Sequence, residues 1–421
     1  MTLTDFDYRS LDSRAAHDAA LDLPLESIDL SNWNLYTTES YGPFYKRLRD
    51  ECPVHYLEDS RYGAFWSITR HDHIKEIDKD HKRFSSEPTI LIDDPVESLD
   101  ISSFIAMDPP EHDVQRRSVS PVVAPRNLAQ MESTIRERVV GILESLPLEE
   151  EFNWVEKVSI ELTTQMLATL FDYPFERRYD LTRWSDVVSL GAQSGYIETF
   201  EDFQREMMEC LAAFQGLFAQ RTDPSHDGFD LLTLMAQNPD TQDLPPLAFL
   251  GNLMLLIVGG NDTTRNSITG GVLALNRYPS EYDKLRAQPE LIPNMVSEII
   301  RWQTPLAHMR RTASEDVEFH GETIRKGDKV ILWYLSGNRD EAVFERADEL
   351  IIDRPNARSH IAFGFGIHRC MGNRLAEMQL RVLWEEIQKR FYWIEVTGEP
   401  VRARSNFVHG YSELPVRVHA L

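Results

Sequence analysis

The stretch FGFGIHRCMG, residues 363–372, places one cysteine among three glycines, directly before a segment with helical spacing. The apolar residues of that segment recur every three or four positions: Leu375, Met378, Val382, Leu383 and Ile387. Cys370 is therefore predicted to lie at a helix N-terminus, where the helix dipole and free N–H groups favour the metal-binding thiolate. The glycines would let a flat group approach the backbone. A lone cysteine is more often a small buried hydrophobe, but this setting argues against that interpretation.

With these neighbours, FGFGIHRCMG resembles the haem-binding loop of the cytochrome P450 family. The resemblance implies haem b, with its iron bound by Cys370 and a thiolate push that favours O–O cleavage. Phe363, Gly364 and Gly372 are predicted to bind the haem: Phe363 would cover one side of the sulfur, and the glycines would let the macrocycle lie close to the backbone. The resemblance also implies that His368 hydrogen-bonds a haem propionate. The alternative for His368 is an exposed loop histidine.

Composition narrows the class of protein. The net charge of −24 over 421 residues disfavours nucleic acid as a partner. Cys52, Cys210 and Cys370 are too widely spaced for a disulfide framework or a zinc site. The N-terminus lacks a signal-peptide pattern, and the apolar run Leu247–Val258 is too short to cross a bilayer. We expect a cytoplasmic protein without a membrane anchor.

Helical patterns prevail, with a smaller β portion. Residues 54–59 and 62–70 are predicted to form a strand pair, and residues 246–278 one long helix. Strands are expected again after Pro305, with turns at Gly321 and Gly327, and through the C-terminal residues. The predicted class is mainly α with minor β. The resemblance implies one P450 domain over 1–421: a β-rich part to about residue 70, a helical part over 71–305, and a haem-loop and β part over 306–421.

The centre of the long helix reads GGNDTT, residues 259–264, where glycines and threonines lower helix propensity. This resembles the P450 oxygen-activation motif, which implies that Thr263 hydrogen-bonds dioxygen, Asp262 relays protons, and Gly260 lies at a kink. Thr263 could instead bond its own backbone four residues back. Asp262 could be a solvated acid paired with Arg265.

Glu298 and Arg301 lie three residues apart and can pair on one helix face. They resemble the buried structural ion pair of the family, whose third member is often an arginine in the stretch where Glu349 stands. Arg339 and Arg346 are the alternatives for that role. An unsupported buried pair would be costly.

Haem propionates require cations or donors. The resemblance implies that His112, Arg116 and Arg311 supply them, and each could otherwise be a plain surface residue.

The segments at 104–119, 159–178, 259–276, 298–313 and 372–381 are similar to the bacterial P450 subgroup that hydroxylates the terminal methyl of medium-chain alkanes and fatty acids. A terminal C–H bond is stronger than its neighbours, so only a narrow apolar channel can select it. The hypothesised channel residues, each of which could be ordinary core, are Leu255, Val258, Gly259, Leu306, Ala307, Phe407 and Val408.

The chain has no flavin or iron-sulfur motif of its own. The resemblance implies a [2Fe-2S] ferredoxin, supplied by a ferredoxin reductase and NAD(P)H, docking near a basic island formed by Arg117, Arg374, Arg381 and Lys389. O2 and a small hydrophobic substrate complete the expected partners. The alternatives are a P450 for bulkier terpenes or steroids and a non-catalytic haem sensor.

Overall fold

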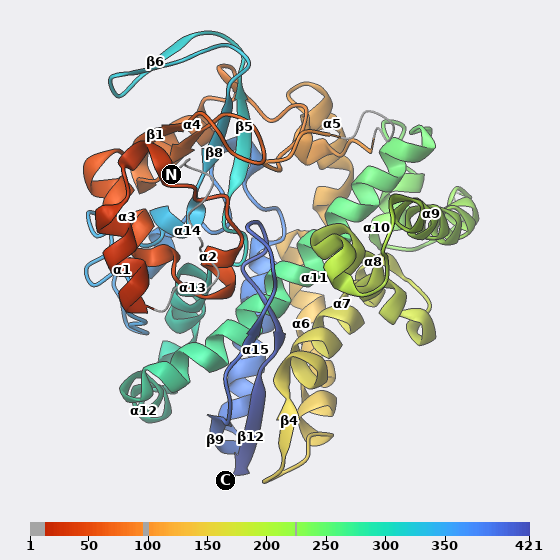
Figure 1. The fold of residues 1–421 in the computed structure, drawn as a ribbon. Coiled ribbons are helices and arrows are strands. Elements are labelled where there is room, and N and C mark those ends of the chain that lie inside the picture. Colours follow the sequence, from red (N-terminus) through yellow and green to blue (C-terminus); the bar gives the residue numbers. More distant parts are fainter. Residues whose placement is uncertain (1–12, 96–100, 224) are drawn as a thin grey trace.

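The computed structural model describes residues 13–95, 101–223 and 225–421. A sheet-rich side and a helical side meet along one long central helix (Figure 1). The longer helices are α1 Ser13–Asp22, α3 Tyr41–Glu51, α4 His71–Lys79, α5 Glu111–Val119, α6 Pro125–Glu144, α7 Glu161–Phe171, α8 Tyr179–Leu190, α9 Phe200–Arg221, α11 Pro246–Arg277, α12 Pro279–Ala287, α13 Ile292–Gln303 and α15 Asn373–Gln388. The short helices are α2 Asn34–Thr37, α10 Leu231–Ala236 and α14 Tyr334–Gly337.

The strands are short and lie mainly at the two ends of the chain. Their bounds are β1 Val54–Leu57, β2 Phe65–Ile68, β3 Phe84–Ser85, β4 Glu151–Asn153, β5 Met309–Ala313, β6 Val317–Phe319, β7 Glu322–Ile324, β8 Lys329–Leu332, β9 Phe391–Val396, β10 Val401–Arg402, β11 Tyr411–Glu413 and β12 Pro415–Ala420. The predicted class, mainly α with minor β, is confirmed.

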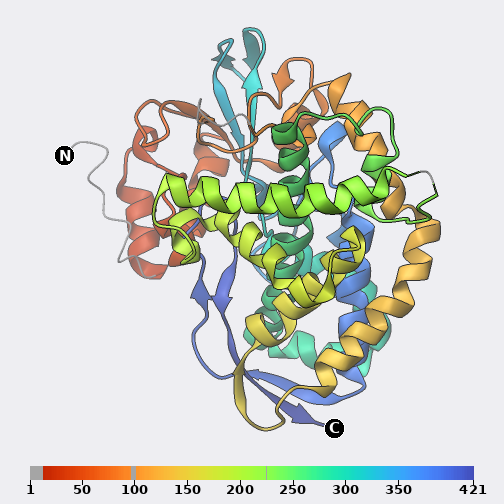
Figure 2. The same cartoon turned by 90° about the vertical axis from the view of Figure 1, so that its right-hand side faces the viewer.

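Helix α11 is the predicted long helix, and it runs unbroken for 32 residues. At 1.5 Å per residue it extends about 48 Å, enough to cross the molecule. Residues 264–275 are buried on every face of the helix, because α13, α15 and the β9 strand pack around them. Helix α9 crosses the other half of α11 on the outside (Figure 2).

The largest sheet has the strand order β1-β2-β8-β5-β3. The predicted strand pair is confirmed as β1 and β2, which pair antiparallel from Val54 opposite Ile68. Positive φ angles at Gly321 and Gly327 confirm the two predicted turns. Strand β5 pairs with β8 so that Arg311 stands opposite Val330, which carries the arginine into the interior.

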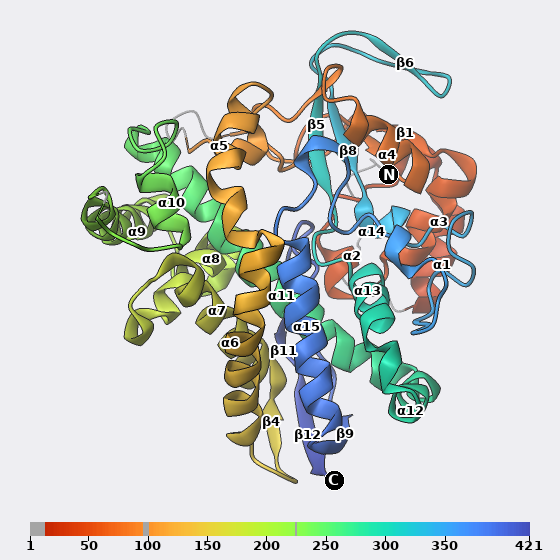
Figure 3. The ribbon, with the colours of Figure 1, turned by 180° about the vertical axis from the view of Figure 1, so that it is seen from behind.

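Helix α15 lies beside α6, and the β4-β12-β9 sheet lies at the C-terminal end of the molecule (Figure 3). The buried side chains of α15, including Leu380, Leu383 and Ile387, join the main apolar core. The start of α15 is fixed by that packing, and with it the loop that carries Cys370.

Among the residues described, no helix combines the length and apolar character that crossing a membrane requires.

Candidate functional site

The loop before α15 is a tight turn closed by its own backbone. The Cys370 N–H donates to the Phe363 carbonyl at 2.8 Å, and the Gly364 N–H donates to that of Ile361 at 2.8 Å. Gly364 and Gly366 have φ of +70° and +68°, a region that side chains strongly disfavour. Helix α15 begins at Asn373 with Gly372 as its N-cap, so Cys370 lies just before a helix N-terminus, as predicted.

The surroundings of the Cys370 sulfur exert opposing effects. The Cys370 side chain is exposed on the side of the neighbouring cavity, but the protein around the sulfur desolvates it and raises the pKa of the thiol. The N–H groups of Gly372 and Asn373, together with Arg116 and Arg369, act to lower this pKa. The helix start therefore assists the thiolate, but desolvation outweighs it until a counter-charge is present. A metal cation at the sulfur would supply that counter-charge. Cys370 also borders a cavity of about 560 Å³ that Phe363 lines as well.

Several imidazoles and guanidinium groups converge next to this loop. The rings of His112 and His368 lie 4.3 Å apart, and both residues are buried. Burial, together with Arg311, His112, Arg116 and His81, holds the pKa of His368 well below its ordinary value. Within the part of the chain that the structure describes, neither ring nitrogen of His368 has a hydrogen-bond partner, nor has Nε2 of His112.

Buried imidazole nitrogens without partners are costly unless a ligand satisfies them. An anionic group between these rings and arginines would satisfy them, which is the chemistry of a haem propionate. The residues present therefore fit haem. Arg116 donates to the Arg369 carbonyl, and Arg311 pairs with Asp78 at 2.8 Å. His81 also belongs to this cluster, and sequence reasoning missed it because an isolated histidine carries no motif.

The middle of α11 borders open space although both halves of the helix are packed. Leu255, Val258, Gly259 and Thr263 are accessible, and among the described residues a Cβ added at Gly259 would meet nothing within 4 Å. At Gly260, in contrast, a Cβ would approach Leu167 of α7 to 2.8 Å. Gly259 thus opens the helix surface to a ligand, whereas Gly260 allows α7 to pack.

The acid and alcohol of GGNDTT have different environments. The Thr263 hydroxyl donates to the Gly259 carbonyl at 2.8 Å, which is the backbone interaction considered above. Asp262 is fully buried rather than solvated. Its carboxylate accepts from Arg265 at 2.8 Å and from Ser189 of α8. Asp262 therefore links α11 to α8.

The remaining channel candidates come from two loops that are joined by backbone. The Ala307 N–H donates to the Phe407 carbonyl at 2.8 Å, and Leu306 forms an isolated bridge with Val408. Leu306 and Phe407 are half-buried, whereas Ala307 and Val408 are buried. The two half-buried side chains therefore remain available to contact a ligand, and the two buried ones support them.

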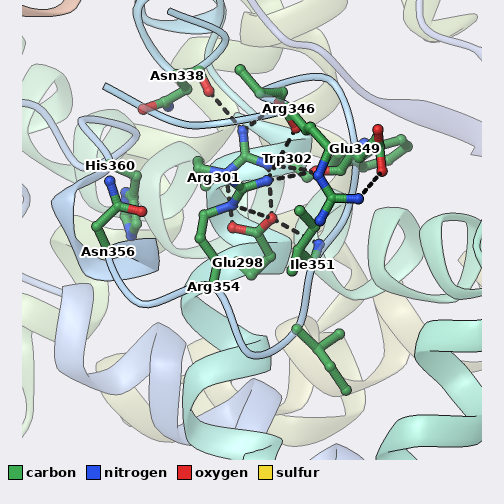
Figure 4. A network of polar contacts seen from close by, with 12 residues as sticks. Glu298, Arg301, Trp302, Asn338, Arg346, Glu349, Ile351, Arg354, Asn356 and His360 are labelled. Carbon is green, nitrogen blue, oxygen red and sulfur yellow. Dashed lines mark hydrogen bonds and ion pairs between the residues drawn. The ribbon is translucent and has the colours of Figure 1, made fainter. Parts of the chain in front are cut away.

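Glu298 and Arg301 form a bidentate ion pair at 2.7 and 2.8 Å with no exposure of either side chain (Figure 4). Arg301 also donates to the carbonyls of Asn338, Ala347 and Glu349 at 2.7 to 2.8 Å. The helix is thus tied to the segment that precedes the cysteine loop.

The expectation that Arg339 or Arg346 completes this network is wrong. The third member is Arg354, whose Nε lies 2.9 Å from Glu298 Oε1. Arg346 makes an exposed pair with Glu349 at 3.2 Å, and Arg339 donates to the Trp302 carbonyl. Position 354 lies five residues after Glu349, and only the fold of this segment brings it back to Glu298.

Comparisons with known proteins agree with this geometry. The cytochrome P450 family model matches residues 141–412. A linalool 8-monooxygenase of Pseudomonas putida is 37% identical over 405 residues, covering 93% of this chain and 99% of that protein. A methyl-branched lipid omega-hydroxylase of Mycobacterium tuberculosis is 32% identical, covering 94% of each. The solved structure of cytochrome P450-153 from Novosphingobium aromaticivorans is 43% identical with a TM-score of 0.86, covering 93% of this chain and 99% of that one.

The chain belongs to the cytochrome P450 family. It is accordingly a haem b monooxygenase, which uses O2, a redox partner and a hydrophobic substrate.

Proposed function

We propose that this cytochrome P450 is a cytoplasmic enzyme that hydroxylates the terminal methyl of medium-chain alkanes or fatty acids. The observation that carries the proposal is the accessible stripe on α11. Leu255, Gly259 and Thr263 follow one another at four-residue spacing on one helix face, and the channel candidates in the 306–307 and 407–408 loops are apolar. An unbranched chain end could reach Thr263 along this stripe without burying a charge.

The chain's own residues would place and protect the reacting end. Cys370 would hold the haem, which when bound would supply the oxidising power for hydroxylation of a C–H bond. Gly259 leaves room beside the helix, and Leu306 and Phe407 restrict the approach to one direction. The Thr263 hydroxyl donates to the Gly259 carbonyl, and its oxygen could still accept a hydrogen bond from a ligand on the accessible side. Asp262 lies one residue away and would serve as a buried acid for proton relay.

Support for the substrate class comes from the relatives. One is named a methyl-branched lipid omega-hydroxylase, which is oxidation at a chain end. A second candidate substrate, a bulkier terpene, is favoured by the similarity to linalool 8-monooxygenase. Both substrates are hydrophobic, so the width of the channel is what separates them.

The deciding experiment titrates octane, dodecanoic acid and linalool into the purified haem-loaded protein while recording the haem absorbance, and then identifies the products. We expect the linear chains to shift the spectrum and to give the terminal alcohol as the main product. A spectral response to linalool alone, or oxidation mainly at internal carbons of the linear chains, would refute the proposal.

We further propose that a [2Fe-2S] ferredoxin docks over the cavity beside Cys370. Arg358, Arg369 and Arg374 line that cavity and are exposed, a local positive region on an acidic protein. Of the other predicted docking residues, Arg381 pairs with Glu132 and Glu385 at 2.9 and 2.7 Å, and Lys389 pairs with Glu386 at 2.7 Å. These two are therefore partly neutralised, while Arg117 stays exposed.

The docking site is tested by replacing Arg374 with glutamate and measuring reduction of the haem at increasing ferredoxin concentration. We expect a higher KM for ferredoxin, with a difference from the wild type that shrinks as salt screens the charges. The control is Arg346→Glu, at another exposed arginine, which should leave the KM unchanged. An equal effect of both changes would contradict this docking site.

A further inference from the structure

A buried carboxylate on α4 connects three separate parts of the haem site. The Asp78 side chain has no exposed surface. Its oxygens accept from Arg311 Nη2 at 2.8 Å, from the Tyr334 hydroxyl at 2.8 Å and from the Phe365 N–H at 3.1 Å. These donors come from β5, from α14 and from the loop that carries Cys370. One side chain therefore holds a candidate propionate ligand and the cysteine loop together.

The backbone around Asp78 fits the same loop closely. A Cβ added at Gly366 would lie 2.1 Å from the Asp78 carbonyl oxygen, so this position accepts only glycine unless the loop moves. The Nζ atoms of Lys75 and Lys79 lie 5.1 and 5.2 Å from the centre of the Phe365 ring, within cation–π range. The C-terminal part of α4 therefore packs directly against residues 364–366 of the cysteine loop.

The negative charge of Asp78 also matters, because it faces the positive charge of Arg311 in the protein interior. Burial raises the pKa of Asp78, and Arg311 acts against that rise. Arg311 is itself buried, and its other hydrogen bond goes to the Arg310 carbonyl. Without Asp78, the guanidinium would keep its charge in the interior with no acid among these contacts, and would be drawn elsewhere.

We propose that Asp78 is a positioning residue for haem, which orients Arg311 toward the propionate cluster and fixes the cysteine loop through Phe365. It acts through Arg311 and the loop rather than by touching the haem. Both the affinity for haem and the state of the thiolate ligand should therefore depend on it.

The test replaces Asp78 with asparagine in the full haem-loaded protein and measures the rate of haem transfer to apomyoglobin. Asparagine keeps the size but removes the charge and one acceptor oxygen. We expect haem loss to accelerate about tenfold or more, and a larger part of the reduced carbon monoxide spectrum to lack the thiolate signature. The matched control is Asp72→Asn on the same helix, where the side chain is 80% exposed; this change should leave both measurements as in the wild type.

A merely structural effect is separated by combining Asp78→Asn with Arg311→Met. If Asp78 acts through Arg311, the two effects on the rate of haem loss should not multiply, and the double variant should exceed the faster single variant only by the part that Asp78 contributes through Phe365. Multiplied rates, or a wild-type rate for Asp78→Asn, would overturn the proposal. Should Asp78→Asn not fold, Tyr334→Phe is the second variant, because it leaves the Asp78–Arg311 pair intact and removes one donor to Asp78. This variant should lose haem faster than the wild type but more slowly than Arg311→Met. Haem loss at or above the Arg311→Met rate would equally overturn the proposal.

Discussion

Replacing Arg354 with methionine tests the buried network most sharply. Glu298 would keep Arg301 but lose its bond to Arg354 Nε, and three carbonyls, those of Glu345, Arg346 and Glu349, would lose donors. Breaking a buried ion pair by removing one partner costs about 3 to 5 kcal/mol. With an unfolding entropy of about 2.1 cal/mol/K per residue over 421 residues, about 4 kcal/mol corresponds to a fall in Tm of about 4 to 5 °C.

The assay is the thermal unfolding of the haem-loaded protein, followed by far-UV circular dichroism and by haem absorbance. The matched control is Arg346→Met, because Arg346 and Glu349 are 59% and 44% exposed and such pairs contribute about 0 to 1 kcal/mol. Its Tm should fall by about 1 °C or less. If Arg346→Met lowers the Tm as much as Arg354→Met, the assignment of Arg354 as the third member is refuted.

Two further predictions concern the site, and a third concerns the buried residue His308, whose Nδ1 lies 3.0 Å from the Asn406 carbonyl oxygen. Thr263→Ala should retain haem but divert electrons from product to hydrogen peroxide; unchanged coupling of NAD(P)H to product counts against its role. Gly259→Leu should leave the Tm within about 2 °C, since the position is open, yet abolish the spectral response to dodecanoic acid. Gly260→Leu should instead destabilise the fold, because the new side chain collides with Leu167. A larger loss of Tm for Gly259→Leu than for Gly260→Leu would contradict the geometry. Burial lowers the pKa of His308 from 6.5 to about 4. The folded state therefore resists protonation of this ring, and the free energy of unfolding should fall by up to about 3 kcal/mol as the pH drops from about 6.5 to 4. His308→Gln should make the free energy of unfolding depend less on pH in this range, and an unchanged dependence would exclude His308 as its source.

Local sequence signals predicted the elements whose determinants are also local. The long helix ends close to where expected because prolines stand at positions 246 and 279 and the segment between them contains none. The Gly321 and Gly327 turns were predictable for a similar reason, since their backbone angles favour glycine. The position of Cys370 before α15 followed from helical spacing alone.

Features that depend on contacts distant in sequence could not be predicted. Arg354 returns to Glu298 only through the path of the intervening segment, and Asp78 contacts Phe365 across 287 positions. The two central glycines look equivalent in the sequence, yet Gly260 packs on Leu167 while Gly259 faces open space. The burial of Asp262 likewise depends on α8, which supplies Ser189.

The most direct test of the account is the reduced carbon monoxide spectrum of the purified haem-loaded protein. If Cys370 is the axial ligand, the main absorption band should stand at the red-shifted position of thiolate-ligated haem, and Cys370→His should move it to the position of histidine-ligated haem. A band at the histidine position in the unaltered protein, or a thiolate band that persists after Cys370 is replaced, would contradict it.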